Sequence, residues 1–273
     1  MRRHVLERIA FYTFMALVGT FFALPILYLV LAPFNPRGTL AVEIPSLPTL
    51  AHFQAVFRNA FAVRALLNSA IIGLGAMVLT TVLAILAAYA LSRTNLPSRD
   101  FLVYALILFS SIVTGTAAMV PIFLLVYQLG LIDSHAGVIL VFSGGLLPTA
   151  VFILRDFVEG LPRSYEESAL VNGATSWQMF KDVVVPLLRP GMMVVGIWAF
   201  VNVWGAFLIP FILLRTPTRM PASVAIYSFY TEAGTPILTL TSTYALLYTI
   251  PVLVLYLFVN WRYGFRFFGG IKR

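Results

Sequence analysis

The chain has 273 residues, of which 60% are hydrophobic and only 10% are charged, and its mean hydropathy is +0.95. In a soluble globular domain about a quarter of the residues are charged. This composition therefore excludes that class and indicates a polytopic membrane protein. The formal net charge is +8, yet no basic run with interleaved aromatic residues points to nucleic acid. Cysteine is absent, which excludes a disulfide framework and thiol chemistry.

Six apolar stretches are long enough to cross a bilayer, which requires roughly 20 residues. The first, from Ile9 to about Ala32, follows a short basic amino terminus. It is longer than the roughly 7 to 15 apolar residues of a signal peptide and lacks a clear cleavage site, so we expect it to be retained. The others run from about Leu66 to Leu91, Phe101 to Tyr127, Gly137 to Leu154, Gly191 to Leu214 and Leu238 to Trp261. The sequence therefore predicts an all-α polytopic membrane protein with six transmembrane helices.

The distribution of basic residues predicts the orientation of these helices. With the amino terminus inside, the inner segments hold 13 of the Lys and Arg residues and the outer segments hold 5. The positive-inside rule then places both termini in the cytoplasm. We expect residues 1–65 to form the first transmembrane helix and an outer connection, with a short interfacial helix at Leu50 to Arg58. Residues 66–261 form the transmembrane core with a cytoplasmic loop at 156–190, and residues 262–273 form a cytoplasmic tail.

A polar segment, Leu161 to Pro190, separates the fourth and fifth predicted spans. Ser164 with Glu167 fits a capping box, and Thr175 with Gln178 fits a second one. A capping box marks the start of a helix, because the two side chains satisfy backbone groups at the helix amino terminus. The segment is therefore predicted to form two short helices.

The residues between and after these helices predict how the chain turns. Gly173 lies just past the first helix, where a left-handed backbone is common, and Pro186 is expected to end the second helix. Trp177, Phe180 and Val184 recur at helical spacing on one side of the second helix. This apolar side is predicted to dock a partner.

The same segment resembles the cytoplasmic EAA loop of the membrane subunits of bacterial ABC importers. The family pattern is Glu, two small residues, three spacers, Gly, nine spacers, an aliphatic residue, a spacer, an aliphatic residue and Pro. The residues that keep every spacing are Glu167, Ser168, Ala169, Gly173, Val183, Val185 and Pro186. Ser replaces the usual Ala and two valines replace the usual Ile and Leu. The resemblance implies a type I ABC importer permease (MetI-like) fold in which this loop couples the chain to an ATPase.

Other segments resemble the carbohydrate (maltose-type) branch, in particular subunits similar to the smaller membrane subunit of the maltose permease. They are residues 67–69, 87–93, 130–133, 147–148 and 269–273, and the resemblance covers nearly the whole chain. It departs after Trp204, where Gly205 and Ala206 replace an Asn and an acidic residue that are frequent in the branch. The role of that polar pair is therefore not carried over. The implied function is a permease subunit of an ATP-driven importer for a di- or oligosaccharide, in a bacterial or archaeal plasma (inner) membrane.

The resemblance also implies the partners. They are a second permease subunit that completes a heterodimer, two cytoplasmic ABC ATPase subunits, an extracytoplasmic sugar-binding protein and membrane lipid, with no nucleic acid. ATP and Mg are expected on the ATPase subunits, and this chain is expected to hold no cofactor and no metal and not to be an enzyme. The residues agree, since neither Lys181 nor Lys272 lies in a P-loop pattern. The spans also lack the acidic and histidine chains of proton-coupled carriers.

Several single residues have two interpretations from the sequence. Glu166 either pairs with a basic residue of the ATPase or is solvated at a helix start, where negative charge is favoured. Asn68, Asn202 and Trp204 either contact sugar along the translocation pathway or serve as interhelical amides and an interfacial aromatic residue. Glu232, the single acid of the third outer loop, either contacts the binding protein or keeps the loop solvated.

Other functions are less consistent with the sequence. An ABC permease for an amino acid, phosphate or polyamine is the first alternative, because the EAA loop is shared across these systems. A membrane-embedded enzyme needs clustered acid, base or metal-binding groups, whereas the acids outside the loop are scattered singly. A passive channel needs a ring of charges or a filter-like run, and the sequence has neither.

Overall fold

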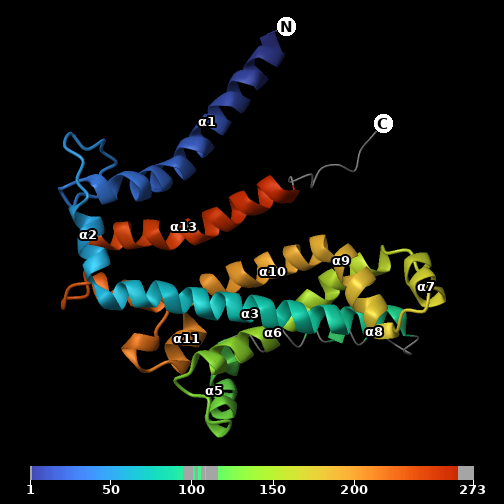
Figure 1. Cartoon of the computed structure of the whole chain (residues 1–273). Helices are drawn as coiled ribbons and strands as arrows, with labels where there is room; N and C mark the ends of the chain where they lie inside the picture. The colour runs from blue at the N-terminus through green and yellow to red at the C-terminus, as the bar shows by residue number, and fades with distance from the viewer. Residues whose placement is uncertain (1, 95–100, 102–103, 106–107, 109–115, 264–273) are drawn as a thin grey trace. The chain divides into compact units, whose positions relative to one another are not determined.

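The computed structural model describes residues 2–94, 101, 104–105, 108 and 116–263, and this part of the chain is helical, with one isolated β-bridge and no strand. The long helices are α1 (Arg2–Leu31), α3 (Ala60–Arg93), α6 (His135–Glu159), α10 (Arg189–Trp204) and α13 (Leu238–Tyr263) (Figure 1). Shorter ones are α2 (Ala51–Arg58), α5 (Met119–Gln128), α7 (Ser164–Val171), α8 (Ser176–Met179), α9 (Val185–Leu187), α11 (Leu208–Leu213) and α12 (Ala222–Ala225). Two compact units are distinguished, Met1–Val63 with Ala225–Val254, and Arg64–Val224 with Leu255–Arg273.

Within the described residues, four helices are long and apolar enough to cross a membrane: Glu7–Phe34, Ala60–Arg93, His135–Glu159 and Leu238–Trp261. A fifth crossing results if Ser176–Leu187 and Arg189–Trp204, which meet at an angle of 71°, are counted as one bent span. The predicted span at Phe101 to Tyr127 lies partly outside the described residues, and its last part forms η2 (Thr116–Ala118) and most of α5. The all-helical prediction is confirmed, and six spans remain a prediction.

The fifth predicted span differs from the structure in its second half. It was expected to run from Gly191 to Leu214, but α10 ends at Trp204 and α11 forms a separate helix. Gly205 caps α10, and Pro210 lies in the first turn of α11. Proline lacks an N–H group and is tolerated in a first turn but not in a helix interior, so the chain restarts rather than continues.

The first unit contains a short helix where the sequence predicted one. α2 confirms it over nearly the same residues, with Val56 fully buried and Phe57 exposed. In the same unit Tyr244 of α13 is fully buried, and its hydroxyl donates to Ala62 O at 3.3 Å. The ring of Tyr244 packs on Phe229, with centroids 5.1 Å apart.

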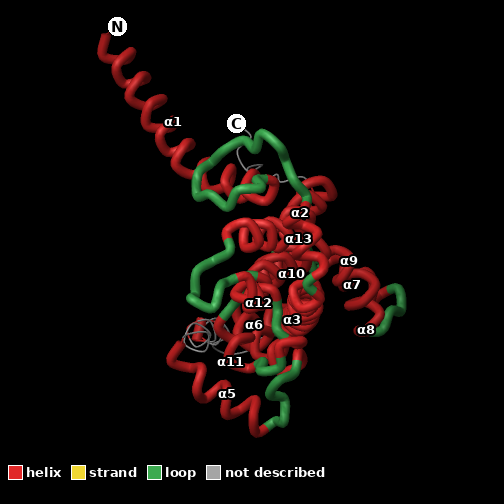
Figure 2. Tube along the Cα trace, turned by 90° about the vertical axis from the view of Figure 1, so that its left-hand side faces the viewer, coloured by secondary structure: helices red, strands yellow, loops and turns green. Residues whose placement is uncertain are grey.

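In the second unit α3, α6 and α10 lie side by side (Figures 1 and 2). Glycines allow this close approach: a Cβ added at Gly73 would lie 2.9 Å from the Phe200 ring of α10, and one at Gly75 would lie 2.6 Å from Ile139 of α6. Small residues at helix interfaces let backbones approach closely in membranes. An apolar core, here called the loop-side core, joins these helices to the polar segment through Leu154, Val158, Phe180 and Val184, among others.

Candidate functional site

The polar segment forms two short helical runs joined by a sharp turn at Gly173. Gly173 has φ +85°, in the left-handed region that suits glycine. Ala174 N donates to Ala169 O at 3.1 Å, and Gly173 N donates to Leu170 O at 3.0 Å. This pair of bonds is the Schellman motif, which satisfies the last carbonyls of a helix. The predicted turn after the first helix is confirmed.

Of the two predicted capping boxes, one is present. Gln178 N donates to Thr175 Oγ1 at 3.3 Å, and Thr175 N donates to Gln178 Oε1 at 2.8 Å. The box that begins at Ser164 was wrong, because Ser164 lies inside the helix and the preceding Arg163 makes no side-chain cap. The helical turn already starts at Pro162, whose carbonyl accepts from Tyr165 N at 3.3 Å. A cap needs extended backbone, which this early turn removes.

Pro186 does not end the second helical run, contrary to the prediction. The chain stays helical to Leu187 and then bends at Leu188, where α10 begins one residue later. A π-helix, η3 (Phe180–Val184), lies just before the proline. Proline removes one backbone hydrogen bond and crowds the carbonyl four residues earlier, and a wider turn is one way to accommodate it. The loop therefore continues directly into α10.

The predicted docking side of the second helix is divided between the interior and the surface. Phe180 and Val184 are buried in the loop-side core and so are not available to a partner. Trp177 stays 64% exposed, with its ring stacked on Phe180 at 5.8 Å. On the first helix Leu170 and Val171 are also exposed. We call Leu170, Val171 and Trp177 the exposed loop residues.

Glu166 is not solvated at the helix start, and its carboxylate has a basic partner within its own chain. It is only 8% exposed, and its carboxylate accepts from Arg93 Nε at 2.7 Å and from the Tyr89 hydroxyl at 2.9 Å. Arg93 also donates to Val158 O at 3.1 Å and to Leu161 O at 3.0 Å, at the carboxyl end of α6. We call these contacts the Glu166–Arg93 tie; they join the carboxyl end of α3 to α7. Figure 1 shows this end of α3 near α7 and α8. Glu166 therefore holds the loop to its own chain.

The other residues of the EAA pattern divide by exposure. Glu167, Ser168 and Gly173 are exposed, whereas Ala169, Val183, Val185 and Pro186 are half-buried. Ala169 and Val185 pack against the loop-side core. The half-buried residues thus fix the loop on the unit, and the exposed ones lie on the surface of the chain.

Two of the three predicted pathway residues are covered by the chain itself. Asn68 is 5% exposed, and its amide donates to Thr218 O at 2.9 Å and to Met220 O at 3.0 Å. Trp204 is also buried, stacked on Phe200 with centroids 5.1 Å apart. Both side chains thus have partners within the chain, and contact with sugar remains a prediction for them.

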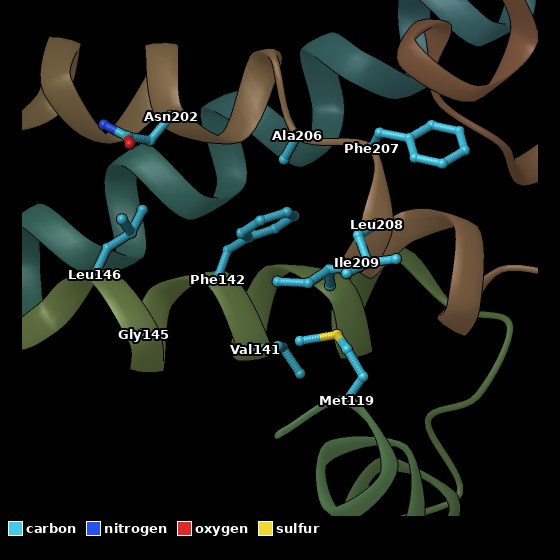
Figure 3. A pocket seen from close by; sticks show the side chains of 10 residues that line it. All are labelled: Met119, Val141, Phe142, Gly145, Leu146, Asn202, Ala206, Phe207, Leu208 and Ile209. Carbon is cyan, nitrogen blue, oxygen red and sulfur yellow. The ribbon is translucent and has the colours of Figure 1, made fainter. Parts of the chain in front are cut away.

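Asn202, the third pathway residue, lines a cavity of about 290 Å³ between α6, α10 and α11. Figure 3 shows Phe142 and Leu146 on α6 extending toward α10, which carries Asn202. The other lining residues are Met119, Val141, Gly145, Ala206, Phe207, Leu208 and Ile209. The Asn202 amide donates to Trp198 O at 2.7 Å, within its own helix. The cavity thus combines apolar and aromatic walls with one amide.

A second polar cluster lies around Asp133, in the turn before α6. Asp133 Oδ1 accepts from Arg215 N at 2.9 Å and from Thr216 N at 3.0 Å, and Oδ2 accepts from Thr216 Oγ1 at 2.5 Å. Arg219 lies 3.4 Å from Oδ2. The hydrogen bonds from Thr216, foremost its hydroxyl, lower the pKa of Asp133 to about 2. This cluster fixes the start of the loop that follows α11.

Glu232 lies in the first unit, in a turn closed by Thr231 N to Thr235 O at 2.8 Å and Gly234 N to Thr231 O at 2.9 Å. Its side chain is exposed. Contact with a binding protein remains a prediction for this residue.

Residues 80–265 match the family model described as binding-protein-dependent transport system inner membrane component, and this range is more than half of the chain. The chain belongs to this family. The Glu166–Arg93 tie, the turn at Gly173 and the cavity all lie within the matched range. The membership supports a multi-pass membrane protein that acts in transport.

Relatives of this inner membrane component are named for carbohydrates. A maltodextrin transport system permease protein of Bacillus subtilis is 27% identical over 94% of this chain and 92% of that protein. A galactooligosaccharides permease protein of the same organism is 29% identical over 95% and 93%. A trehalose permease protein of Mycobacterium tuberculosis is 33% identical over 78% of each chain. The resemblance to the carbohydrate branch of ABC permeases is confirmed.

The fold is also that of an ABC transporter chain. A crystal structure of a bacterial ABC transporter involved in the import of the acidic polysaccharide alginate superposes with a TM-score of 0.82 over 96% of this chain and 98% of that chain, at 19% identity. At this identity the similarity concerns the fold. The predicted helical ABC permease fold is confirmed.

The left-handed backbone at Gly173 predicts that different substitutions at this position destabilise the loop to different degrees. Gly173→Val should destabilise the loop by about 1–2 kcal/mol, because β-branched residues are strained at positive φ. A Cβ would meet no atom within 4 Å, so Gly173→Asn, which tolerates this backbone better, should cost less than half as much. Gly173→Asp should fold like the Asn variant, because its Cβ would occupy the same open space. Hydrogen exchange at Gly173 and Ala174 measures the effect, and equal losses in Val and Asn variants would contradict it.

The lowered pKa of Asp133 predicts how acid affects the loop that follows α11. An Asp in an unfolded chain has a pKa of about 3.9, and the folded value is about 2. The cluster should therefore contribute its full stability above about pH 4 and lose it as pH falls through about 2. A spin label on Thr218→Cys should keep one mobility from pH 7 to 4 and become more mobile near pH 2. Loosening already at pH 5 to 6 would contradict this, and Asp133→Asn should abolish the acid step.

Proposed function

We propose that this chain is a permease subunit of an ATP-driven ABC importer for a di- or oligosaccharide, and that it forms the translocation pathway with a second permease subunit. The observation that carries the proposal is the family match together with full-length relatives named for maltodextrin and galactooligosaccharides. The sugar reaches the pathway from an extracytoplasmic binding protein. The chain crosses the plasma membrane six times, with both termini in the cytoplasm.

Two cytoplasmic ATPase subunits supply the free energy and hold ATP and Mg²⁺, so this chain needs no ATPase site or cofactor of its own. They dock on the exposed loop residues, where Trp177 and Val171 offer apolar surface. ATP binding closes the ATPase pair and displaces the loop, which continues into α10 at Leu188. Because the ATPase contacts differ between the inward- and outward-facing states, ATP shifts the equilibrium between them.

The cavity at Asn202 suits part of a sugar. An aromatic wall such as Phe142 packs against the apolar face of a pyranose ring, and an amide satisfies hydroxyl groups. Its volume of about 290 Å³ lies near the lower end for small-molecule pockets, roughly 300–1,000 Å³. We propose that this cavity is the chain's contribution to the pathway.

Asn202→Leu tests the cavity. Loss of one hydrogen bond to the sugar, about 1 kcal/mol, should raise the sugar concentration for half-maximal transport about fivefold. The measurement is uptake of labelled sugar into proteoliposomes. Gln54→Leu makes the same exchange at an exposed position of α2 and should leave that concentration unchanged. Equal concentrations for wild type and Asn202→Leu would remove Asn202 from the pathway.

The proposed function is tested by purifying the tagged chain from membranes and assaying ATPase activity. Two ATPase copies and a second permease should co-purify, and a di- or oligosaccharide with its binding protein should raise ATP turnover. Stimulation by an amino acid, phosphate or a polyamine instead would identify the alternative importer. Solute flux from the chain alone, without ATPase, would favour a channel and overturn the proposal.

A further inference from the structure

Helix α3 is tied to a different loop at each of its ends. Near its carboxyl end, Tyr89 and Arg93 bond to Glu166 of the cytoplasmic loop. Near its amino end, Asn68 donates to the carbonyls of Thr218 and Met220. The next residue, Ser69, is also buried, and its hydroxyl oxygen accepts from Ala222 N at 2.8 Å.

The segment 215–222 is thus held from two sides. Asn68 and Ser69 hold it to α3, while Asp133 holds it to the turn before α6 through Arg215 and Thr216. If α3 moved relative to that turn, the segment would have to change conformation, because its bonds reach both. Segment 215–222 is therefore placed to respond to the position of α3.

Between Asn68 and Arg93, α3 has the features of a helix that moves as a unit. It runs from Ala60 to Arg93 without proline. At 1.5 Å per residue, Asn68 and Arg93 lie about 38 Å apart along the axis, more than the roughly 30 Å of a bilayer core. Gly73 and Gly75 bring it into close contact with α10 and α6, and close-packed interfaces transmit displacement rather than absorb it.

We propose that α3 is a lever that carries displacement of the cytoplasmic loop to segment 215–222, with Arg93 and Asn68 as positioning residues at its two ends. The proposed function is needed only for the source of the displacement, which is the ATPase. The mechanical connection is a property of this chain alone. A signal at the loop thereby reaches the outer segment without passing through the cavity at Asn202.

The chain has no cysteine, so a single Thr218→Cys takes one spin label on the exposed segment. The full chain is studied in lipid nanodiscs without ATPase or sugar. Glu166→Gln weakens the bond to Arg93 at nearly constant shape. It should change the ratio of mobile to immobile label about threefold or more, since a mutation along a coupled network typically shifts an equilibrium about 2- to 30-fold. Tyr89→Phe should act in the same direction but less. Asp182→Asn, the same exchange on an exposed loop residue, should have no effect.

Removing the contacts of Asn68 with Thr218 and Met220 distinguishes transmission along α3 from a general destabilisation of the chain. In an Asn68→Leu background Glu166→Gln should no longer change the label at position 218. No response to either Glu166→Gln or Tyr89→Phe, or an equal response in the Asn68→Leu background, would overturn the proposal. A label on Val171→Cys, in place of the label at position 218, reports whether each variant keeps its loop folded. If Glu166→Gln does not fold, Tyr89→Phe replaces it in the test. Because no ATPase is present, failure of the importer assignment appears separately, in the co-purification.

Discussion

Arg93→Met should lower the free energy of unfolding by about 3–5 kcal/mol, the usual cost of removing one partner from a buried ion pair. Both side chains are largely buried, with 13% of Arg93 and 10% of Glu166 exposed. Methionine fills a similar volume but leaves the Glu166 carboxylate without a cation. It also removes the donor of the Leu161 carbonyl and one of the donors of the Val158 carbonyl, near the carboxyl end of α6, where the helix dipole favours a positive charge.

The control is the double variant Arg93→Met, Glu166→Gln, which removes the stranded charge and should recover part of the loss. Arg93→Lys should fall between wild type and Arg93→Met, because one ammonium group does not reproduce the planar guanidinium that reaches Glu166, Val158 and Leu161 together. Thermal unfolding followed by fluorescence-detected size exclusion ranks the variants. If single and double variants unfolded at the same temperature, the stranded charge would not be the cause.

The local features of the loop were predictable from the sequence, because they depend on residues a few positions apart. The bonds at Thr175 and Gln178 and the turn at Gly173 follow from side-chain type and backbone preference alone. The error at Ser164 has the same origin, since Pro162 started the turn earlier than the capping pattern required. Such local rules locate a helix end to within one or two residues.

The tertiary ties were not predictable in this way. Arg93 and Glu166 are 73 positions apart, and Asn68 and Thr218 are 150 apart. Two adjacent acids, Glu166 and Glu167, look alike in the sequence, and only the rotation of α7 turns the first inward. The one signal was a basic residue at the last turn of a span that faces an acidic loop, which favours a pair across the helix end.

The break between α10 and α11 was missed because its residues are apolar, not because it depends on contacts distant in the sequence. Gly205 to Phe207 is apolar, so hydropathy averages it with the flanking helices into one span. The signals were the glycine and Pro210 five residues later, which mark the end of one helix and the first turn of the next. The break gives Ala206 and Phe207 non-helical backbone beside the cavity, a location where irregular backbone at membrane depth is tolerated.

On the docking surface proposed for the ATPase subunits, Trp177→Ala should weaken their capture about thirtyfold, equivalent to the roughly 2 kcal/mol lost when an aromatic anchor is truncated. It should leave the stability of the chain within about 0.5 kcal/mol of wild type, because the side chain is 64% exposed. Phe180→Ala is the matched control: the rings stack at 5.8 Å, but Phe180 is buried in the loop-side core, so its loss should cost about 3–5 kcal/mol. Titration of purified ATPase onto the chain in nanodiscs, alongside thermal unfolding, separates the two effects. Wild-type affinity in Trp177→Ala would move the docking surface elsewhere, and destabilisation equal to that of Phe180→Ala would show that Trp177 supports the fold instead.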